Sequence, residues 1–341
     1  MGLRRTSINF ANTLLKNSRY RLVEANNLYD WQTANKRGKK YCCAVLPEGA
    51  AEYLRRNNPR LSEYQRRYEN FDSTVTEPLV WTNDKLKDED ISYFRGDNAY
   101  VWQLRGTNMH EMGYTLATYY LMSMDRLDLL NCLYEDGAFG SFTFKIAGKV
   151  VSRDLLDSIA EIYFLEKHLG ISTMRDFSVL DIGGGYGRLA HRMAEALPGL
   201  GHYYCTDAVA ASTFICEYYL EYRNIRHKAS SIALDRIEQT LAGAAVDIAV
   251  NVHSFSECKV PAIQWWLKLL TRYRVPFLMV VPNHYDKAGK RMLTNDGRDI
   301  SRLIREAGYC EIALEPKYED PLVQKYAINP SHYALYELAR A

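Results

Sequence analysis

The sequence lacks any long hydrophobic run. Its longest apolar stretches, such as residues 277–281, have the length of a strand and fall far short of the roughly 18 residues that a membrane helix needs. No basic, then apolar, then small-residue leader opens the chain, so we expect a cytoplasmic protein without stable membrane insertion. The seven cysteines are an odd number without a CxxC pair, which indicates reduced thiols and agrees with that compartment.

The chain also lacks net charge. Its 43 basic and 41 acidic residues leave a formal charge of +2, which gives no support for nucleic-acid binding. The charge is uneven, because residues 1–67 contain 14 Lys and Arg against 5 Asp and Glu. This basic region either meets an anionic acceptor or a membrane surface, or is a solvated helical face. Residues Gly2–Thr6 formally match the N-myristoylation pattern.

The first half of the chain lacks strand–helix alternation. Its apolar spacing predicts a helix from Gly113 to Asp136, and a second helix that begins after an N-cap at Ser152 and ends at Gly170. The second helix has a clean apolar face at Leu155, Ile159, Ile162, Leu165 and Leu169. We therefore predict two parts, a mainly helical region over 1–150 that binds the acceptor or forms a lid, and a second domain over 151–341.

The second part alternates short apolar runs with helical patterns. The expected strands are 177–182, 202–205, 246–250 and 277–281, and the expected helices are 187–197, 208–222, 261–273 and 297–307. This order is typical of an α/β fold with a mostly parallel sheet and helices on both faces. The runs 311–315 and 332–338 have no helical pattern between them, which predicts a C-terminal antiparallel strand pair.

A glycine-rich turn lies at the first strand-to-helix junction of this sheet. It has the pattern D-x-G-x-G-x-G, at Asp181, Gly183, Gly185 and Gly187, with Gly184 between them. A dinucleotide fingerprint would need glycine where Arg188 stands. The turn resembles the cofactor motif of class I S-adenosylmethionine-dependent methyltransferases. The resemblance implies a Rossmann-like sheet over about residues 150–341 and S-adenosyl-L-methionine as cofactor.

Asp207 follows the next predicted strand, 24 residues after Gly183. A carboxylate at this distance from the glycine turn can accept hydrogen bonds from both ribose hydroxyls, although an isolated Asp here would more often cap the following helix. The resemblance implies that Asp181 helps to hold the methionine amine. The predicted cofactor-binding residues are thus Asp181, Gly183, Gly184, Gly185, Gly187, Asp207 and Asn251.

The segment from Asp247 to Glu257 runs from a buried strand into the sheet edge where such sheets bind ligands. Strand alternation would put Asn251 and His253 on one side. The segment does not have the proline-containing pattern of base N-methyltransferases. Together with residues 152–159 and Tyr93–Gly96, it is similar to bacterial sugar O-methyltransferases, which pair a helical N-terminal region with a methyltransferase sheet.

A sugar hydroxyl is protonated at neutral pH, so its methylation benefits from a general base, and the ordinary pKa of histidine suits that task. His253 is the predicted base, and Glu257 is predicted to orient it. Alternatively, His253 is a structural residue, Ser254 and Glu257 form a capping box, or His284 is the base. We expect no metal, because Asp207, Asp247 and Glu257 lack ligand spacing.

The predicted function is S-adenosylmethionine-dependent O-methylation of a sugar hydroxyl in a small-molecule or glycan acceptor, such as a nucleotide-linked sugar or a surface-glycan precursor. The alternatives are an O-methyltransferase for a polyketide or aromatic compound, and a catalytically silent binding module. Arg95, among aromatic residues, is a candidate for acceptor binding or for a structural ion pair. Arg153 is a second candidate anion ligand. A homo-oligomer is compatible with the sequence.

Overall fold

The computed structural model describes residues 10–15, 22, 46–81, 86–96 and 111–339. It divides into two compact units, of which the first comprises residues 1–51, 92–163 and 316–330. The second unit comprises residues 52–91, 164–315 and 331–341. The predicted boundary at residue 150 therefore differs from the observed division, because residues 52–91 belong with the sheet and residues 316–330 do not. In the described part of the chain, every helix is too short or too polar to cross a membrane.

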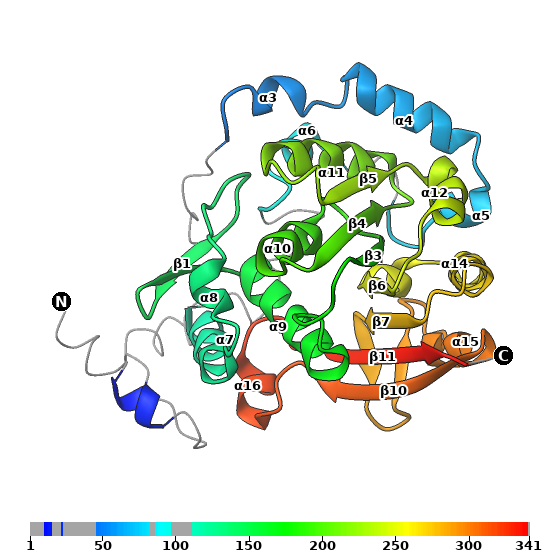
Figure 1. Ribbon diagram of the computed structural model, residues 1–341. Coiled ribbons are helices and arrows are strands. Elements are labelled where there is room, and N and C mark those ends of the chain that lie inside the picture. The colour runs from blue at the N-terminus through cyan, green and yellow to red at the C-terminus, as the bar shows by residue number, and fades with distance from the viewer. Residues whose placement is uncertain (1–9, 16–21, 23–45, 82–85, 97–110, 340–341) are drawn as a thin grey trace. The chain divides into compact units, whose positions relative to one another are not determined.

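The second unit is built on a mixed sheet. Among the described residues, seven strands form it in the order β10-β11-β7-β6-β3-β4-β5 (Figure 1). The strands are β3 (Phe177–Ile182), β4 (Leu200–Thr206), β5 (Ala229–Ile232), β6 (Ile248–Val252), β7 (Phe277–Val281), β10 (Tyr309–Pro316) and β11 (His332–Leu338). The five neighbouring strands β7, β6, β3, β4 and β5 are parallel to one another, whereas β11 runs antiparallel to β7. The predicted fold class, Rossmann-like with a mostly parallel sheet, is confirmed.

The central strands form because their residues are apolar on both faces. In β3, for example, Val179, Leu180 and Ile182 are all buried, as expected of a parallel strand covered by helices on both sides. The connecting helices are α10 (Arg188–Ala196), α11 (Ala210–Tyr222), α12 (Ile237–Gly243), α13 (Ser254–Glu257), α14 (Val260–Arg272) and α15 (Ile300–Glu306). A 3-10 turn, η3 (Leu234–Arg236), precedes α12, and a hairpin of β8 (His284–Asp286) and β9 (Arg291–Leu293) follows β7.

The expectation of no helix between the last two strands is wrong. Helix α16 (Pro321–Tyr326) lies between β10 and β11 in sequence. Asp320 caps it by accepting hydrogen bonds from the backbone N–H groups of Leu322 and Val323. The Asp-Pro start signal was present in the sequence, but the helix is too short to show a helical repeat.

The first unit contains α7 (Glu111–Met124), α8 (Leu129–Cys132), α16, the start of α9 (Arg153–Leu169) and an antiparallel hairpin of β1 (Thr143–Ile146) and β2 (Lys149–Ser152). The predicted helix over 113–136 is thus broken. The break follows from Asp125, whose carboxylate accepts hydrogen bonds from Leu129 N and Leu130 N and so starts a new helix. The predicted cap of α9 is confirmed, since Ser152 Oγ accepts a hydrogen bond from Leu155 N at 3.1 Å.

Residues 52–91 pack on the sheet unit through α4 (Pro59–Glu69), which lies against α11. Arg60 makes a two-pronged ion pair with Glu217, at 2.9 and 2.8 Å. The buried hydroxyl of Tyr68 lies 2.7 Å from Thr213 Oγ1 and accepts a hydrogen bond from Leu234 N at 3.0 Å. At least one basic residue of this segment, Arg60, is therefore used in packing against the sheet unit. Residues 1–9, which contain the myristoylation pattern, lie outside the described part.

The Tyr68 contacts generate a stability prediction. We expect Tyr68→Phe to lower the free energy of unfolding by about 1–3 kcal/mol, because it leaves the buried Leu234 N–H without its acceptor. Chemical denaturation measures the loss, and amide hydrogen exchange should be accelerated at Leu234. The control is Tyr222→Phe, at a ring that is 39% exposed. Equal stability of the two variants would contradict the assigned contact.

Candidate functional site

The glycine turn connects β3 to α10 at the carboxyl edge of the sheet. Gly183 N and Gly184 N both donate hydrogen bonds to Thr206 O, at 2.8 and 3.1 Å. Gly183, Gly185 and Gly187 have φ values of 74°, 55° and 84°, a region that favours glycine. The turn is therefore fastened to the end of β4, and glycine is required by its backbone conformation.

Two of these glycines differ in what surrounds them. A methyl group at Gly183 would overlap the side chain of Ser254, whereas one at Gly185 would have no heavy atom of the described residues within 4 Å. Gly183 is therefore required for packing of the turn against the segment after β6. Gly185 instead leaves open space beside the backbone, as needed for close approach of a ligand.

Asp207 and the glycine turn are in direct contact. Asp207 Oδ2 accepts a hydrogen bond from Gly185 N at 3.1 Å, and Oδ1 accepts one from Val209 N at 2.8 Å. The pKa of this carboxyl is raised to about 6, mainly by burial; the two N–H donors oppose the shift, and the charge of Glu257 adds to it. Asp207 is thus ionised at neutral pH and becomes protonated as the pH falls through about 6.

Asp181 and Asn251 lie behind the turn. Asp181, at the end of β3, is buried and accepts a hydrogen bond from Tyr203 Oη at 2.9 Å. Asn251 is fully buried; its Nδ2 donates to Ile182 O, and its Oδ1 accepts from Phe255 N, each at 2.8 Å. The amide of Asn251 therefore ties the end of β3 to the start of α13. Cofactor binding by these two side chains stays a prediction.

Strand β6 ends at Val252, and His253 lies just beyond it. The expected strand alternation, which would put Asn251 and His253 on one side, therefore does not reach His253. Its backbone has φ 69° and ψ −30°, an uncommon conformation for a non-glycine residue. Its N–H donates to Val281 O at 2.7 Å, and its carbonyl accepts from Ser256 N at 3.0 Å. His253 is the N-cap position of α13 without a side-chain cap bond, so the alternative of a Ser254–Glu257 capping box is wrong. Backbone strain of this kind is concentrated at functional sites.

Among the partners of the Glu257 side chain in the described part of the chain are Trp81 and Asn283, which the sequence did not single out. Its Oε2 accepts a hydrogen bond from Trp81 Nε1 at 2.5 Å, and its Oε1 accepts one from Asn283 Nδ2 at 2.9 Å. Leu79 N also donates to Glu257 O, at 2.7 Å. Trp81 belongs to an irregular segment far away in the sequence, and no local pattern pointed to it.

The alternative base, His284, is exposed at the start of β8. Asp247 lies before β6, at the opposite end of the strand from the glycine turn, and its carboxylate accepts a hydrogen bond from Ser178 N at 2.8 Å. Within the described ranges, no group of three or more His, Cys, Asp or Glu side chains is placed to hold a metal ion.

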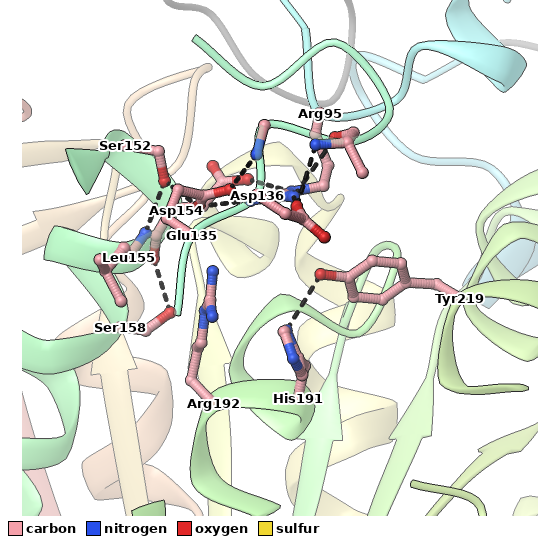
Figure 2. Close-up of polar contacts among 12 residues, drawn as sticks. Arg95, Glu135, Asp136, Ser152, Asp154, Leu155, Ser158, His191, Arg192 and Tyr219 are labelled. Carbon is pink, nitrogen blue, oxygen red and sulfur yellow. Dashed lines mark hydrogen bonds and ion pairs between the residues drawn. The ribbon is translucent and has the colours of Figure 1, made fainter. Parts of the chain in front are cut away.

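Arg95 occupies a structural position in the first unit, not the predicted acceptor site. Its fully buried guanidinium contacts three carboxylates, those of Glu135 at 2.7 Å, Asp154 at 3.0 Å and Asp136 at 3.3 Å (Figure 2). Such a charge is retained in the interior because its partners compensate the loss of hydration. Arg153 pairs with Asp157 at 3.1 Å on the same helix. The residues that follow Gly96, up to residue 110, lie outside the described part.

A scan against protein-family models finds no match, and a search of curated proteins finds no significant similarity. Similar solved structures include an S-adenosylmethionine-dependent methyltransferase from Aquifex aeolicus, 14% identical over 53% of this chain and 89% of its own, with a TM-score of 0.41. Magnesium protoporphyrin IX methyltransferase from Synechocystis PCC 6803, solved with bound cofactor, is 12% identical over 55% of this chain and 83% of its own, with a TM-score of 0.39. The cyclase SpnF is 14% identical over 56% and 84% of the two chains, with a TM-score of 0.38. The function is therefore inferred from the chain's own geometry.

The contrast between the two glycines is testable without a ligand. We expect Gly183→Ala to destabilise the protein by several kcal/mol, because it combines a steric overlap with strain at positive φ. Gly185→Ala should lower the free energy of unfolding by only about 1–2 kcal/mol, because the added methyl group meets open space and only the positive φ is unfavourable. Thermal unfolding of both variants gives the comparison. Equal losses would show that Gly183 and Ser254 are not packed as described.

Proposed function

We propose that this chain is an S-adenosylmethionine-dependent methyltransferase. The observation that carries the proposal is the hydrogen bond between Asp207 and Gly185 N, since it joins the glycine turn of β3 to the carboxylate after β4. In open α/β sheets this edge is the ligand-binding edge, and the two features together suit a nucleoside. S-adenosylmethionine, when bound, supplies an electrophilic methyl group on a sulfonium.

The contacts of the turn indicate which groups remain for the cofactor. Gly183 N and Gly184 N are already used by Thr206 O, so the open side of Gly185 is the place for close backbone approach. Asp207 would accept hydrogen bonds from the ribose hydroxyls. Asp181, just before the turn, would add a negative charge toward the methionine amine.

We further propose that the acceptor is a hydroxyl of a sugar, as a small molecule or within a glycan precursor, and that the protein works in the cytoplasm. The resemblance of the Asn251–Glu257 segment to sugar O-methyltransferases supports this substrate class. His253 lies at the same sheet edge as the glycine turn, where it would take the hydroxyl proton while the oxygen attacks. An aromatic or polyketide hydroxyl is the alternative acceptor, and cofactor binding without catalysis is the alternative function.

The titration of Asp207 predicts how cofactor binding depends on pH. Ribose hydroxyls need the ionised carboxylate, but the free protein holds a proton there below a pKa of about 6. The dissociation constant for S-adenosylhomocysteine should therefore rise about tenfold as the pH falls from 8 to 5. Asp207→Asn should weaken binding by about 10- to 150-fold at pH 8, as for a lost charged hydrogen bond, and should remove most of the pH dependence.

Calorimetric titration at several pH values provides the measurement. The control is Glu221→Gln, which removes an exposed carboxylate on α11 and should behave as the wild type does. If S-adenosylhomocysteine does not bind to the wild type, the proposed function fails. If Asp207→Asn binds normally, the ribose contact is wrongly assigned.

The base assignment predicts a kinetic effect without a binding effect. His253→Ala should retain cofactor affinity and lose about 10²–10⁴-fold in turnover. Single-turnover transfer of labelled methyl groups, to the acceptor selected from a panel of sugars, nucleotide sugars and aromatic alcohols, measures this loss. Normal turnover in His253→Ala, with loss in His284→Ala, would move the base to His284. Cofactor binding without transfer to any member of the panel would favour the silent module.

A further inference from the structure

The β8–β9 hairpin is fixed to the turn that begins with His253. Asn283 N, just before the hairpin, donates a hydrogen bond to Ser256 Oγ at 2.9 Å, and Asn295 N, just after it, donates to Ser256 O at 2.7 Å. Ser256 is buried, and its own N–H donates to His253 O at 3.0 Å. Both ends of the hairpin are therefore held by one residue of α13, which is in direct contact with the predicted base.

The hairpin carries an aromatic stack. Tyr285, in the middle of β8, stacks on His332, the first residue of β11, with ring centroids 3.9 Å apart and an angle of 25° between the ring planes. Both side chains are partly exposed. Within the described ranges, Tyr285 has no second aromatic or cation–π contact, and its hydroxyl group makes no hydrogen bond. The ring thus reaches solvent with a hydrogen-bonding group that the described residues do not use.

The stack lies at the carboxyl edge of the sheet. In the antiparallel pair of β11 and β7, Ala334 is opposite Val280, so His332 lies level with the chain just past the end of β7. On the other side of β7, His253 N donates to Val281 O at 2.7 Å. His253 and His332 therefore flank the end of β7, with their backbones about 10 Å apart, or two strand spacings. A sugar ring with its hydroxyl groups can span most of this separation.

The chemistry of the stack suits a sugar. A sugar ring has an apolar face of C–H groups and a rim of hydroxyl groups. Tyrosine offers the matching pair, an apolar ring and a polar hydroxyl at its end. Two further residues of the hairpin, His284 and Lys287, are exposed and polar. A planar aromatic acceptor would instead favour a pocket lined mainly by apolar side chains.

We propose that Tyr285, supported by His332, is the platform on which the sugar ring of the acceptor lies, with the reacting hydroxyl toward His253. This inference rests on the proposed function and deepens it, because it assigns the acceptor to the β8–β9 hairpin. The platform contacts the ring in the same way before and during methyl transfer. It therefore contributes to KM for the acceptor and not to kcat.

The experiment measures binding of neutral sugars to the full chain loaded with S-adenosylhomocysteine. The probes are the methyl glycosides of glucose, galactose, mannose and rhamnose, with catechol as the planar aromatic alcohol. In saturation-transfer NMR, at least one glycoside should bind through the C–H protons of one ring face. Tyr285→Leu should weaken its binding by about three- to tenfold, the size expected of one lost aromatic contact, whereas Tyr285→Trp should retain it.

Kinetics give a second measurement on the same variants. With the best sugar acceptor of the panel, Tyr285→Leu should raise KM by the same factor and leave kcat unchanged. If Tyr285→Leu does not fold, the ring resonances of Tyr285 in the wild type report the contact directly. They are assigned by their loss in Tyr285→Phe and should shift when the glycoside is added.

A matched control distinguishes this from a general effect of losing a tyrosine. Tyr222→Leu removes a ring that is 39% exposed on α11 of the same unit, and it should leave glycoside binding unchanged. All variants should keep the wild-type affinity for S-adenosylhomocysteine. Unchanged glycoside binding in Tyr285→Leu, or a wild type that binds catechol alone or none of the probes, overturns the inference. A wild type that does not bind S-adenosylhomocysteine would instead overturn the proposed function.

Discussion

The side-chain amide of Asn251 is the contact on which the candidate site depends. It is fully buried and joins the last residue of β3 to the first turn after β6. Because a buried amide without partners would cost several kcal/mol, both bonds must form together. The glycine turn and α13 are thereby held side by side, and Gly183 is needed because Ser254 leaves no room for a larger residue.

The charges at this edge are arranged at a cost to the free protein. Burial is the largest cause of the raised pKa of Asp207, and the negative charge of Glu257 adds to it. Perturbed carboxyl groups of this kind are concentrated at functional sites. Under the proposed function, the ribose hydroxyls of the cofactor would donate hydrogen bonds to the ionised carboxylate of Asp207 and so stabilise it.

The first unit contributes a different kind of polar structure. Arg95 forms ion pairs with Glu135, Asp136 and Asp154, so its positive charge is compensated within the unit. Removing one partner of such a buried set would leave an uncompensated charge. Under the proposed function, we therefore expect the acceptor at the loops of the sheet, near His253 and the β8–β9 hairpin, and not at Arg95.

The sequence by itself determined the alternating strands and helices, the glycine turn with Asp207 after the next strand, and the cap of α9 at Ser152. These features depend on residues close together in the chain or on the repeat of one element. Only the tertiary structure decided the place of residues 52–91, the use of both ends of the Asn251 amide, and the burial of Arg95. The same holds for Glu257, because its partner Trp81 lies 176 residues away. Contacts over such separations leave no periodic pattern, since they are set by how whole elements pack.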